Sequence, residues 1–294
     1  MTEAIQTTQL TKYYGRARGV VALNLTVEPG SFFGFIGPNG AGKSTTIRTL
    51  LGLISPTSGS ALVLGMNAAR QREDILRRVG YLPSEATFYS SMRVREVLQL
   101  SARLRHADCK AEAEQLCERL QLDPTRKIDE LSYGNRKKVG IVCALQSKPE
   151  LLILDEPTSG LDPLIQHEFY ALLQERNKQG VTVFLSSHVL SEIQRNCTHA
   201  AVIREGKLIA CDRVEALTRT TAKRISVRGH VNLSGLDGIR DLQISESTSS
   251  FLYGGSLDAL LRRLSESEVQ DLSIADPDLD EIFLHFYQKE EDRK

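Results

Sequence analysis

Residues 37–44 read Gly37-Pro38-Asn39-Gly40-Ala41-Gly42-Lys43-Ser44, between an apolar run ending at Ile36 and a segment typical of a helix. In a strand–loop–helix context, this G-x-x-x-x-G-K-S spacing predicts a loop that wraps nucleotide phosphates. Glycines let successive backbone N–H groups face inward, and the helix N-terminus attracts an anion. Lys43 would reach the β- and γ-phosphates, while the Ser44 hydroxyl would ligate Mg²⁺. A purely structural glycine turn is the alternative, which a match at so many positions disfavours.

Two carboxylates follow a second apolar run. Asp155 and Glu156 come directly after residues 151–154, Leu-Leu-Ile-Leu. Ligands of open parallel sheets bind at the carboxyl ends of the strands, where these two side chains would lie. Asp155 suits a water-bridged Mg²⁺ site, and Glu156 suits a base that activates the attacking water. An apolar strand followed by acids is common, so this interpretation depends on the glycine-rich loop upstream.

The composition is that of an ordinary soluble protein. Of 294 residues, 41% are hydrophobic and 25% are charged, and 37 basic residues balance 37 acidic ones. A net charge of +0 gives no reason to expect nucleic acid as a partner. No apolar segment approaches the roughly 20 residues of a membrane helix, so a membrane role would need a partner chain. The five cysteines form no C-x-x-C pair, which suits reduced thiols in the cytoplasm.

The order of apolar patterns predicts an α/β fold. Continuous apolar runs at 151–154 and 181–185 indicate strands buried on both faces of a parallel sheet, joined by a crossover helix over 163–178. Residues 5–35 are typical of short strands, whereas 70–122 has a helical pattern. A further helix is expected over 136–146, and one short strand over 60–64.

The pattern of apolar and polar residues changes after Arg213. Alternating segments at 224–228, 241–245 and 251–253, a helix at 257–264 and a strand near 269–274 suggest a small α/β unit, followed by a helical pattern at 279–287. We expect an ATPase-type domain over residues 1–213 and an accessory domain over 214–294. The accessory domain would regulate, dimerise or stabilise the protein, and the sequence does not distinguish these roles.

Residues 5–213 resemble the ATPase subunits of ABC transporters. The resemblance depends on motifs in the family's order: Leu131-Ser132-Tyr133-Gly134-Asn135 at the L-S-G-G-Q signature, Ser159-Gly160-Leu161-Asp162 after the acidic pair, His188 after the next strand, and Tyr14 at the adenine-stacking position. Each motif alone has an ordinary structural explanation, such as a helix cap for Ser132 or a buried histidine. The occurrence of all these motifs in the family's order has no such ordinary explanation.

The resemblance implies a P-loop NTPase with a mixed, mainly parallel sheet, N-terminal antiparallel strands and a helical subdomain inserted at about 84–148. ATP with Mg²⁺ would be held by Gly37 to Thr45, that is Gly37, Pro38, Asn39, Gly40, Ala41, Gly42, Lys43, Ser44 and Thr45. Two subunits would pair head to tail, so that Ser132 and Gly134 of one close over ATP of the other. His188 would contact the γ-phosphate, Asp162 would connect the two sites, and Tyr14 or its neighbour Tyr13 would stack on adenine.

Two departures from the family pattern matter. The glutamine expected to ligate Mg²⁺ after Tyr81-Leu82-Pro83 is replaced by Ser84, with Glu85 next. Either Ser84 ligates the metal, through a bridging water, or Glu85 substitutes for the glutamine. The signature carries Tyr133 and Asn135 in place of glycine and glutamine, while Ser132 and Gly134 remain.

The segment 81–83 and the tail 280–287 look like those of bacterial drug, peptide and immunity exporters whose integral-membrane permease is a separate chain. The protein would then be an ATPase on the inner face of the cell membrane, and a groove beside Ser84 would receive a short permease helix. A soluble ABC ATPase acting on DNA or ribosomes is the alternative, disfavoured by a single phosphate loop, no sustained heptads and zero net charge. A non-hydrolysing ATP sensor is disfavoured by Glu156 and His188, and a small kinase by the long helical insertion before Asp155.

Overall fold

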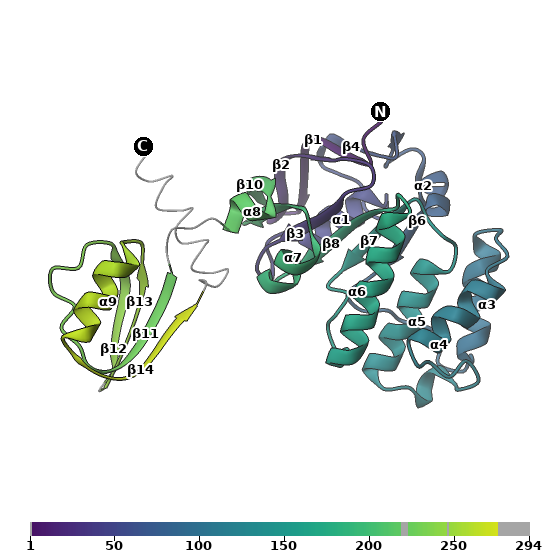
Figure 1. Cartoon of the computed structure of the whole chain (residues 1–294). Coiled ribbons are helices and arrows are strands. Elements are labelled where there is room, and N and C mark those ends of the chain that lie inside the picture. The colour runs from purple at the N-terminus through teal and green to yellow at the C-terminus, as the bar shows by residue number, and fades with distance from the viewer. Residues whose placement is uncertain (1, 219–222, 246, 276–294) are drawn as a thin grey trace. The chain divides into compact units, whose positions relative to one another are not determined.

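The computed structural model describes residues 2–218, 223–245 and 247–275 (Figure 1). The chain divides into two compact units, Met1–Val214 and Glu215–Lys294. Each is described separately below.

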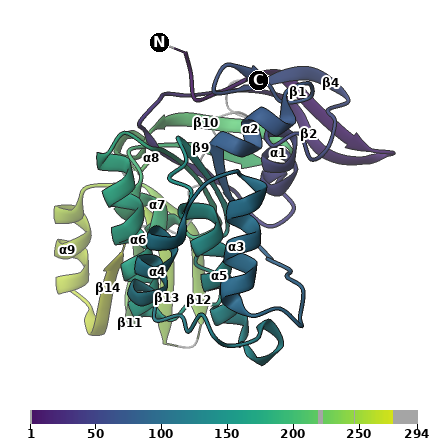
Figure 2. The ribbon, with the colours of Figure 1, turned by 90° about the vertical axis from the view of Figure 1, so that its right-hand side faces the viewer.

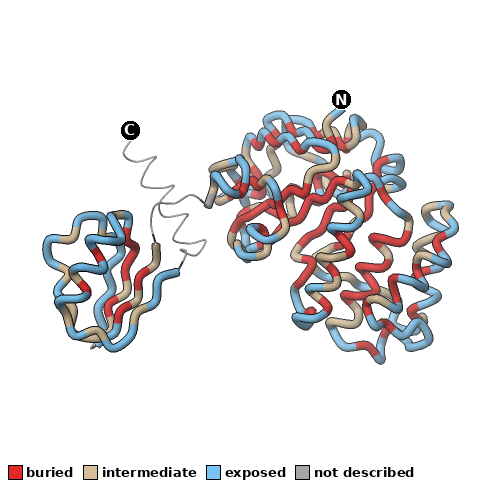
Figure 3. The backbone as a smooth tube through the Cα atoms, in the orientation of Figure 1, coloured by how far each residue is buried: buried red, intermediate tan, exposed pale blue. Residues whose placement is uncertain are grey.

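A six-stranded sheet forms the centre of the first unit. Its neighbours pair in parallel, except that the edge strand β10 is antiparallel to β9. The order across the sheet is β10 (Lys207–Arg213), β9 (His199–Arg204), β3 (Phe32–Ile36), β8 (Thr182–Ser187), β7 (Leu151–Asp155) and β6 (Val79–Leu82). Every residue of β3, β7 and β8 is buried, and Figure 3 shows the centre of this unit in red. The mainly parallel sheet predicted from the continuous apolar runs is confirmed.

A second, antiparallel sheet comes from the N-terminal part of the unit. Its order is β2 (Ala17–Val27), β1 (Ile5–Tyr14), β4 (Ser58–Val63) and β5 (Met66–Asn67). Burial alternates over residues 5–7 of β1 and over residues 23–27 of β2, so one face of this part of the sheet is buried. Helix α1 (Lys43–Leu50) contributes Ile47 and Leu50 to the same core. Because these two side chains are buried, α1 is held in place against the sheet, and the glycine-rich loop that precedes it is held with it.

The inserted region is mostly helical. It contains α3 (Val94–Leu104), α4 (Lys110–Arg119), a 3₁₀ turn (Ile128–Glu130) and α5 (Tyr133–Leu145), and both α3 and α4 pack against α5 (Figure 2). Ion pairs join α4 to α6 (Pro163–Lys178), because Arg119 lies 2.6 Å from both Glu168 and Glu175. The first unit also contains α2 (Arg72–Arg78) and α7 (Leu190–Asn196), and α8 (Val214–Thr218) begins at its last residue.

The helical assignment of 70–122 is wrong in one place. Residues Val79–Leu82 form β6, which pairs with β7 at the edge of the central sheet. This strand is only four residues long, too short for an alternating or continuous apolar pattern to be recognised. Strands β9 and β10 were not predicted either, although His199–Arg204 is a short, largely apolar run.

The described part of the second unit contains a four-stranded antiparallel sheet against which helix α9 packs. The order is β12 (Ile239–Ser245), β13 (Thr248–Tyr253), β11 (Lys223–His230) and β14 (Glu268–Ala275), with α9 (Leu257–Ser265) packed through Leu260 and Leu264. These are the elements expected from the alternating segments after Arg213. The helix predicted over 279–287 lies outside the described residues.

Phe184 on β8 is fully buried, with its ring centroid 5.9 Å from that of Phe33 and 5.4 Å from that of Phe35. Truncating a buried phenylalanine removes transfer free energy and leaves a cavity, so Phe184→Ala should lower the free energy of unfolding by about 3–5 kcal/mol. Urea unfolding of the full chain measures this change. The control Leu164→Ala, at a side chain 80% exposed, should stay within about 0.5 kcal/mol of wild type. Equal losses for both variants would contradict the assignment of this core.

Candidate active site

The glycine-rich loop joins β3 to α1 and encloses a cavity of about 390 Å³. Gly42 caps the helix with φ 106°, which favours glycine, and a Cβ at Gly37 would lie 2.3 Å from the Ile203 carbonyl oxygen. Only glycine fits at both positions. The cavity is lined by Arg18, Gly19, Pro38, Asn39, Gly40, Ala41, Gly42, Lys43, Ser44, Thr45, Ser84 and Glu156.

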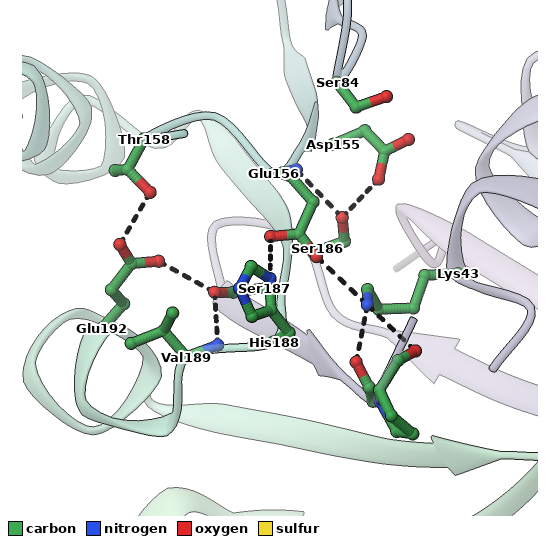
Figure 4. A network of polar contacts seen from close by, with 12 residues as sticks. Lys43, Ser84, Asp155, Glu156, Thr158, Ser186, Ser187, His188, Val189 and Glu192 are labelled. Carbon is green, nitrogen blue, oxygen red and sulfur yellow. Dashed lines mark hydrogen bonds and ion pairs between the residues drawn. The ribbon is translucent and has the colours of Figure 1, made fainter. Parts of the chain in front are cut away.

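Lys43 is buried in the floor of this loop. Its Nζ donates to the Gly37 carbonyl at 2.5 Å and the Pro38 carbonyl at 3.3 Å, and lies 3.1 Å from Glu156 Oε1 (Figure 4). The ammonium therefore ties the end of the loop, at Lys43, to its start at Gly37 and Pro38, and it also faces the carboxylate of Glu156. It is the cation that an entering phosphate would meet.

Glu156 lies between two basic side chains. Its Oε1 faces Lys43, and its Oε2 lies 2.7 Å from His188 Nδ1 (Figure 4). The glutamate side chain is 18% exposed, whereas that of His188 is 51% exposed. A carboxylate with one side toward the phosphate loop and one toward an accessible histidine is placed to orient and deprotonate a water molecule.

Asp155 is the last residue of β7 and is almost fully buried. Its Oδ1 accepts a hydrogen bond from the Ser186 hydroxyl at 2.6 Å, across the parallel pairing of β7 with β8. The pKa of Tyr81 is raised by burial and by the negative charge of Asp155. Ser186 was not predicted as a site residue, although its place at the end of the strand next to Asp155 follows from the two apolar runs.

Oxygen ligands for a divalent cation lie together at this edge of the sheet. Ser44 and Ser84 line the cavity, and Figure 4 shows Ser84 beside Asp155. Hydroxyl and carboxylate oxygens are what Mg²⁺ prefers, and it usually takes one or two carboxylates while waters and phosphates complete the shell. The donor set therefore fits Mg²⁺. The described residues contain no group of three or more His, Cys, Asp and Glu side chains that would form an all-protein metal site.

A buttress of hydrogen bonds supports the His188 loop. Glu192 on α7 accepts from the Thr158 hydroxyl at 2.6 Å and from the Ser187 hydroxyl at 2.8 Å (Figure 4). Ser187 in turn accepts from the backbone N–H of Val189 at 2.9 Å. Glu192 thus links the segment after Glu156 to the segment that carries His188. Sequence reasoning missed it, because a single glutamate on a short helix has no distinguishing pattern.

The signature and the Asp162 loop lie together, away from the cavity lining. Ser132 caps α5 by accepting from the Asn135 N–H at 3.3 Å, and Asp162 caps α6 by accepting from the Ile165 N–H at 3.0 Å. A Cβ at Gly134 would lie 2.7 Å from the Gly160 carbonyl oxygen, so the two loops pack closely. Ser132 and Asp162 are exposed. None of the three lines the cavity around Lys43.

The two candidate adenine-stacking tyrosines are at the end of β1. Tyr14 is 46% exposed and Tyr13 is 40% exposed. A ring carbon of Tyr14 lies 3.2 Å from where a Cβ of Gly19 would be, and Gly19 lines the cavity. Tyr14 is therefore next to the phosphate loop. Arg18, which also lines the cavity, was not predicted and lies 3.3 Å from Glu205.

This fold and site define a P-loop ATPase, and comparison with known proteins identifies its family. The family model described as "ABC transporter" matches residues 20–159. The chain is 42% identical over 215 residues to the bacitracin transport ATP-binding protein BcrA of Bacillus licheniformis, covering 71% of this chain and 69% of that protein. It is 28% identical over 302 residues to the linearmycin resistance ATP-binding protein LnrL of Bacillus subtilis, covering 96% of this chain and 97% of that protein.

Solved structures agree. The structure of an ATP-binding subunit of an ABC transporter superimposes with a TM-score of 0.69 at 30% identity, covering 74% of this chain and 92% of that one. An ABC transporter cassette in its ADP conformation has a TM-score of 0.63 at 25% identity, covering 74% of this chain and 95% of that one. The chain belongs to the ABC transporter family, as an ATP-binding subunit that hydrolyses ATP.

Across the three described segments, every helix is too short or too polar to span a lipid bilayer.

Glu192→Ala should lower kcat for ATP hydrolysis about tenfold or more, because hydrogen bonds to a charged group contribute about 1.5–3 kcal/mol each and a tenfold rate change corresponds to about 1.4 kcal/mol. The affinity for ATP should change little, since Glu192 does not line the cavity. Steady-state ATPase assays and nucleotide titrations measure both. Glu118→Ala, at an exposed glutamate on α4, is the matched control. An unchanged kcat in Glu192→Ala would show that the buttress does not position His188.

Proposed function

We propose that this protein powers export of a substrate through a separate integral-membrane permease, by ATP-driven closure of a head-to-tail dimer. The observation that carries the hydrolytic part is Glu156, held between Lys43 and His188 at the mouth of the phosphate loop. The names of the relatives, bacitracin transport and linearmycin resistance, support the exporter part. Through the permease, the ATPase would lie on the inner face of the membrane.

In this proposal the phosphates of ATP lie against the backbone of Gly37 to Thr45, and Tyr14 stacks on adenine. Mg²⁺, held by Ser44, Asp155 and Ser84, would neutralise charge on the phosphates. The position of Ser84 in the cavity lining favours it over the exposed Glu85 as the metal-side residue. An entering phosphate competes with Glu156 for Lys43, which frees Glu156 Oε1 to accept a proton from water. His188 orients Glu156 through Oε2 and faces the γ-phosphate.

The second copy supplies what one chain lacks at its own cavity. Ser132 and Gly134 are at the N-terminus of the 13-residue helix α5, where a hydroxyl and free N–H groups attract an anion. In the head-to-tail pair they would close over the γ-phosphate of the partner's ATP, with Asp162 at the contact. Hydrolysis then removes charge and contacts, and the pair opens.

The permease would dock in a groove of the first unit. Four exposed apolar side chains line this groove, whose volume is about 950 Å³: Leu53, Tyr89, Leu100 and Leu104. Exposed apolar side chains gathered on one surface mark a protein contact. We further propose that residues 1–213 are the ATPase domain, with about 84–148 as its helical subdomain, and that 214–294 is an accessory domain.

Glu156→Gln should abolish turnover, lowering kcat at least about 100-fold, because the amide cannot accept a proton in place of the carboxylate. It should still bind ATP and should accumulate ATP-bound dimers. ATPase assays and light scattering on a sizing column, with and without ATP, measure the two effects. Hydrolysis at the wild-type rate would rule out Glu156 as the base.

Purification of the tagged full chain from detergent-solubilised membranes of the native host tests the exporter proposal. We expect one integral-membrane chain in stoichiometric amount, lost in Leu104→Glu because the charge prevents burial of that side chain in the contact. Leu261→Glu, at a comparably apolar exposed site on α9, should retain the membrane chain. Recovery with ribosomes or DNA alone would instead support the soluble alternative.

A further inference from the structure

Lys137 on α5 is only 2% exposed and has no role in the site described above. Its Nζ donates to the carbonyl oxygens of Ser84 at 2.7 Å, Glu156 at 3.0 Å and Pro83 at 3.1 Å. A lysine ammonium has three N–H donors, so all three have a backbone acceptor. Burying the charged ammonium costs desolvation free energy, which an apolar side chain at this position would not cost. The lysine is therefore not explained by packing alone.

The three carbonyls belong to two functional loops. Pro83 and Ser84 follow β6, and Ser84 lines the phosphate cavity. Glu156 follows β7. Lys137 itself comes three residues after Gly134, a spacing at which helical residues are neighbours on one face. One ammonium therefore joins the signature end of α5 to the loop that carries Ser84 and to the loop that carries Glu156.

The backbone of Glu156 needs such support. Its φ of 47° is in the left-handed region, which is unfavourable for a residue with a side chain. It also precedes Pro157, which further restricts its conformation. The N–H of Glu156 donates to the Ser186 carbonyl at 3.2 Å, and its own carbonyl accepts from Lys137. Contacts on both sides hold the residue in the conformation that points its carboxylate at Lys43 and His188.

We propose that Lys137 is a positioning residue that holds Glu156 in its strained conformation and couples it to the signature helix and the Ser84 loop. This inference rests on the proposed role of Glu156 as the base. Movement of the N-terminus of α5, on which Ser132 and Gly134 lie, is transmitted to the catalytic carboxylate through the ammonium of Lys137, in addition to the packing of Gly134 on Gly160. Since Lys137 does not line the cavity, it controls water activation and not ATP affinity.

The first test is Lys137→Met in the full chain, which shortens the unbranched side chain by one atom and removes the donors. We expect kcat to fall about tenfold or more, as for a misplaced catalytic group, while the Kd of a fluorescent ATP analogue changes less than about twofold. Lys137→Arg, which keeps the donors, should recover most of the lost kcat. The control Lys110→Met removes an exposed lysine from the start of α4 and should leave both quantities unchanged.

A second measurement follows the loop directly, without turnover. The chain contains no tryptophan, so Tyr89→Trp, at a side chain 72% exposed, is a single reporter in the segment after Ser84. Adding Lys137→Met to this background should increase acrylamide quenching of the tryptophan, because the loop loses two of its hydrogen bonds. Adding Lys110→Met should not.

The outcomes separate the two proposals. An unchanged kcat in Lys137→Met, with Glu156→Gln inactive, overturns the positioning role and leaves Glu156 as the base. Turnover in Glu156→Gln would overturn the base assignment itself. Parallel loss of ATP binding and kcat in folded Lys137→Met would show a general structural role and overturn the inference. If Lys137→Met does not fold, Lys137→Gln and Lys137→Arg decide: equal kcat in both would overturn it.

Discussion

The parallel pairing of β3, β8 and β7 is the constraint on which the site depends. In this register Ile36 pairs with Ser187 and Asp155 pairs with Ser186, so three chain segments distant in sequence end at one edge of the sheet. The three strands are buried along their whole length, as expected of strands covered on both faces of a parallel sheet. The glycine-rich loop, the acidic pair and His188 are thereby brought into contact although they are far apart in the sequence.

The ion pair between Lys43 and Glu156 lets two charged side chains remain largely buried in the site. Both side chains are largely shielded from water, where an unpaired charge is costly. Glu156 is paired on one side with Lys43 and on the other with His188, and its backbone is held in an unfavourable conformation. Strain of this kind persists only where surrounding contacts over-determine it, as Ser186 and Lys137 do here. The supporting residues are thus as much part of the site as the ones that face the cavity.

Much of the fold and of the candidate site could be predicted from the sequence. Whether a residue was predictable depends on whether a local pattern marks it. The phosphate loop and the buried strands have local patterns, glycine spacing and continuous apolar runs, that depend on few neighbours. Lys137, Glu192 and Arg18 each have a contact with a residue far along the chain. The separation is 53 positions between Lys137 and Ser84, 34 between Glu192 and Thr158, and 187 between Arg18 and Glu205. No local pattern marks them. Strand β6 was misassigned as helical because four residues give too little periodicity, and pairing with β7 decides its conformation.

The location of the signature argues for a second molecule. Gly134 is packed against the loop at Gly160 in the same chain, and neither Gly134 nor Ser132 lines the phosphate cavity. A helix N-terminus with an exposed serine hydroxyl is nonetheless suited to bind an anion. Since the contact with Gly160 is fixed by a backbone approach that admits no side chain on Gly134, α5 cannot turn its N-terminus toward its own cavity without breaking it. In the proposed head-to-tail pair, an anion held by another copy would meet no such obstacle, and Asp162, which is exposed, would lie at the contact between the two copies.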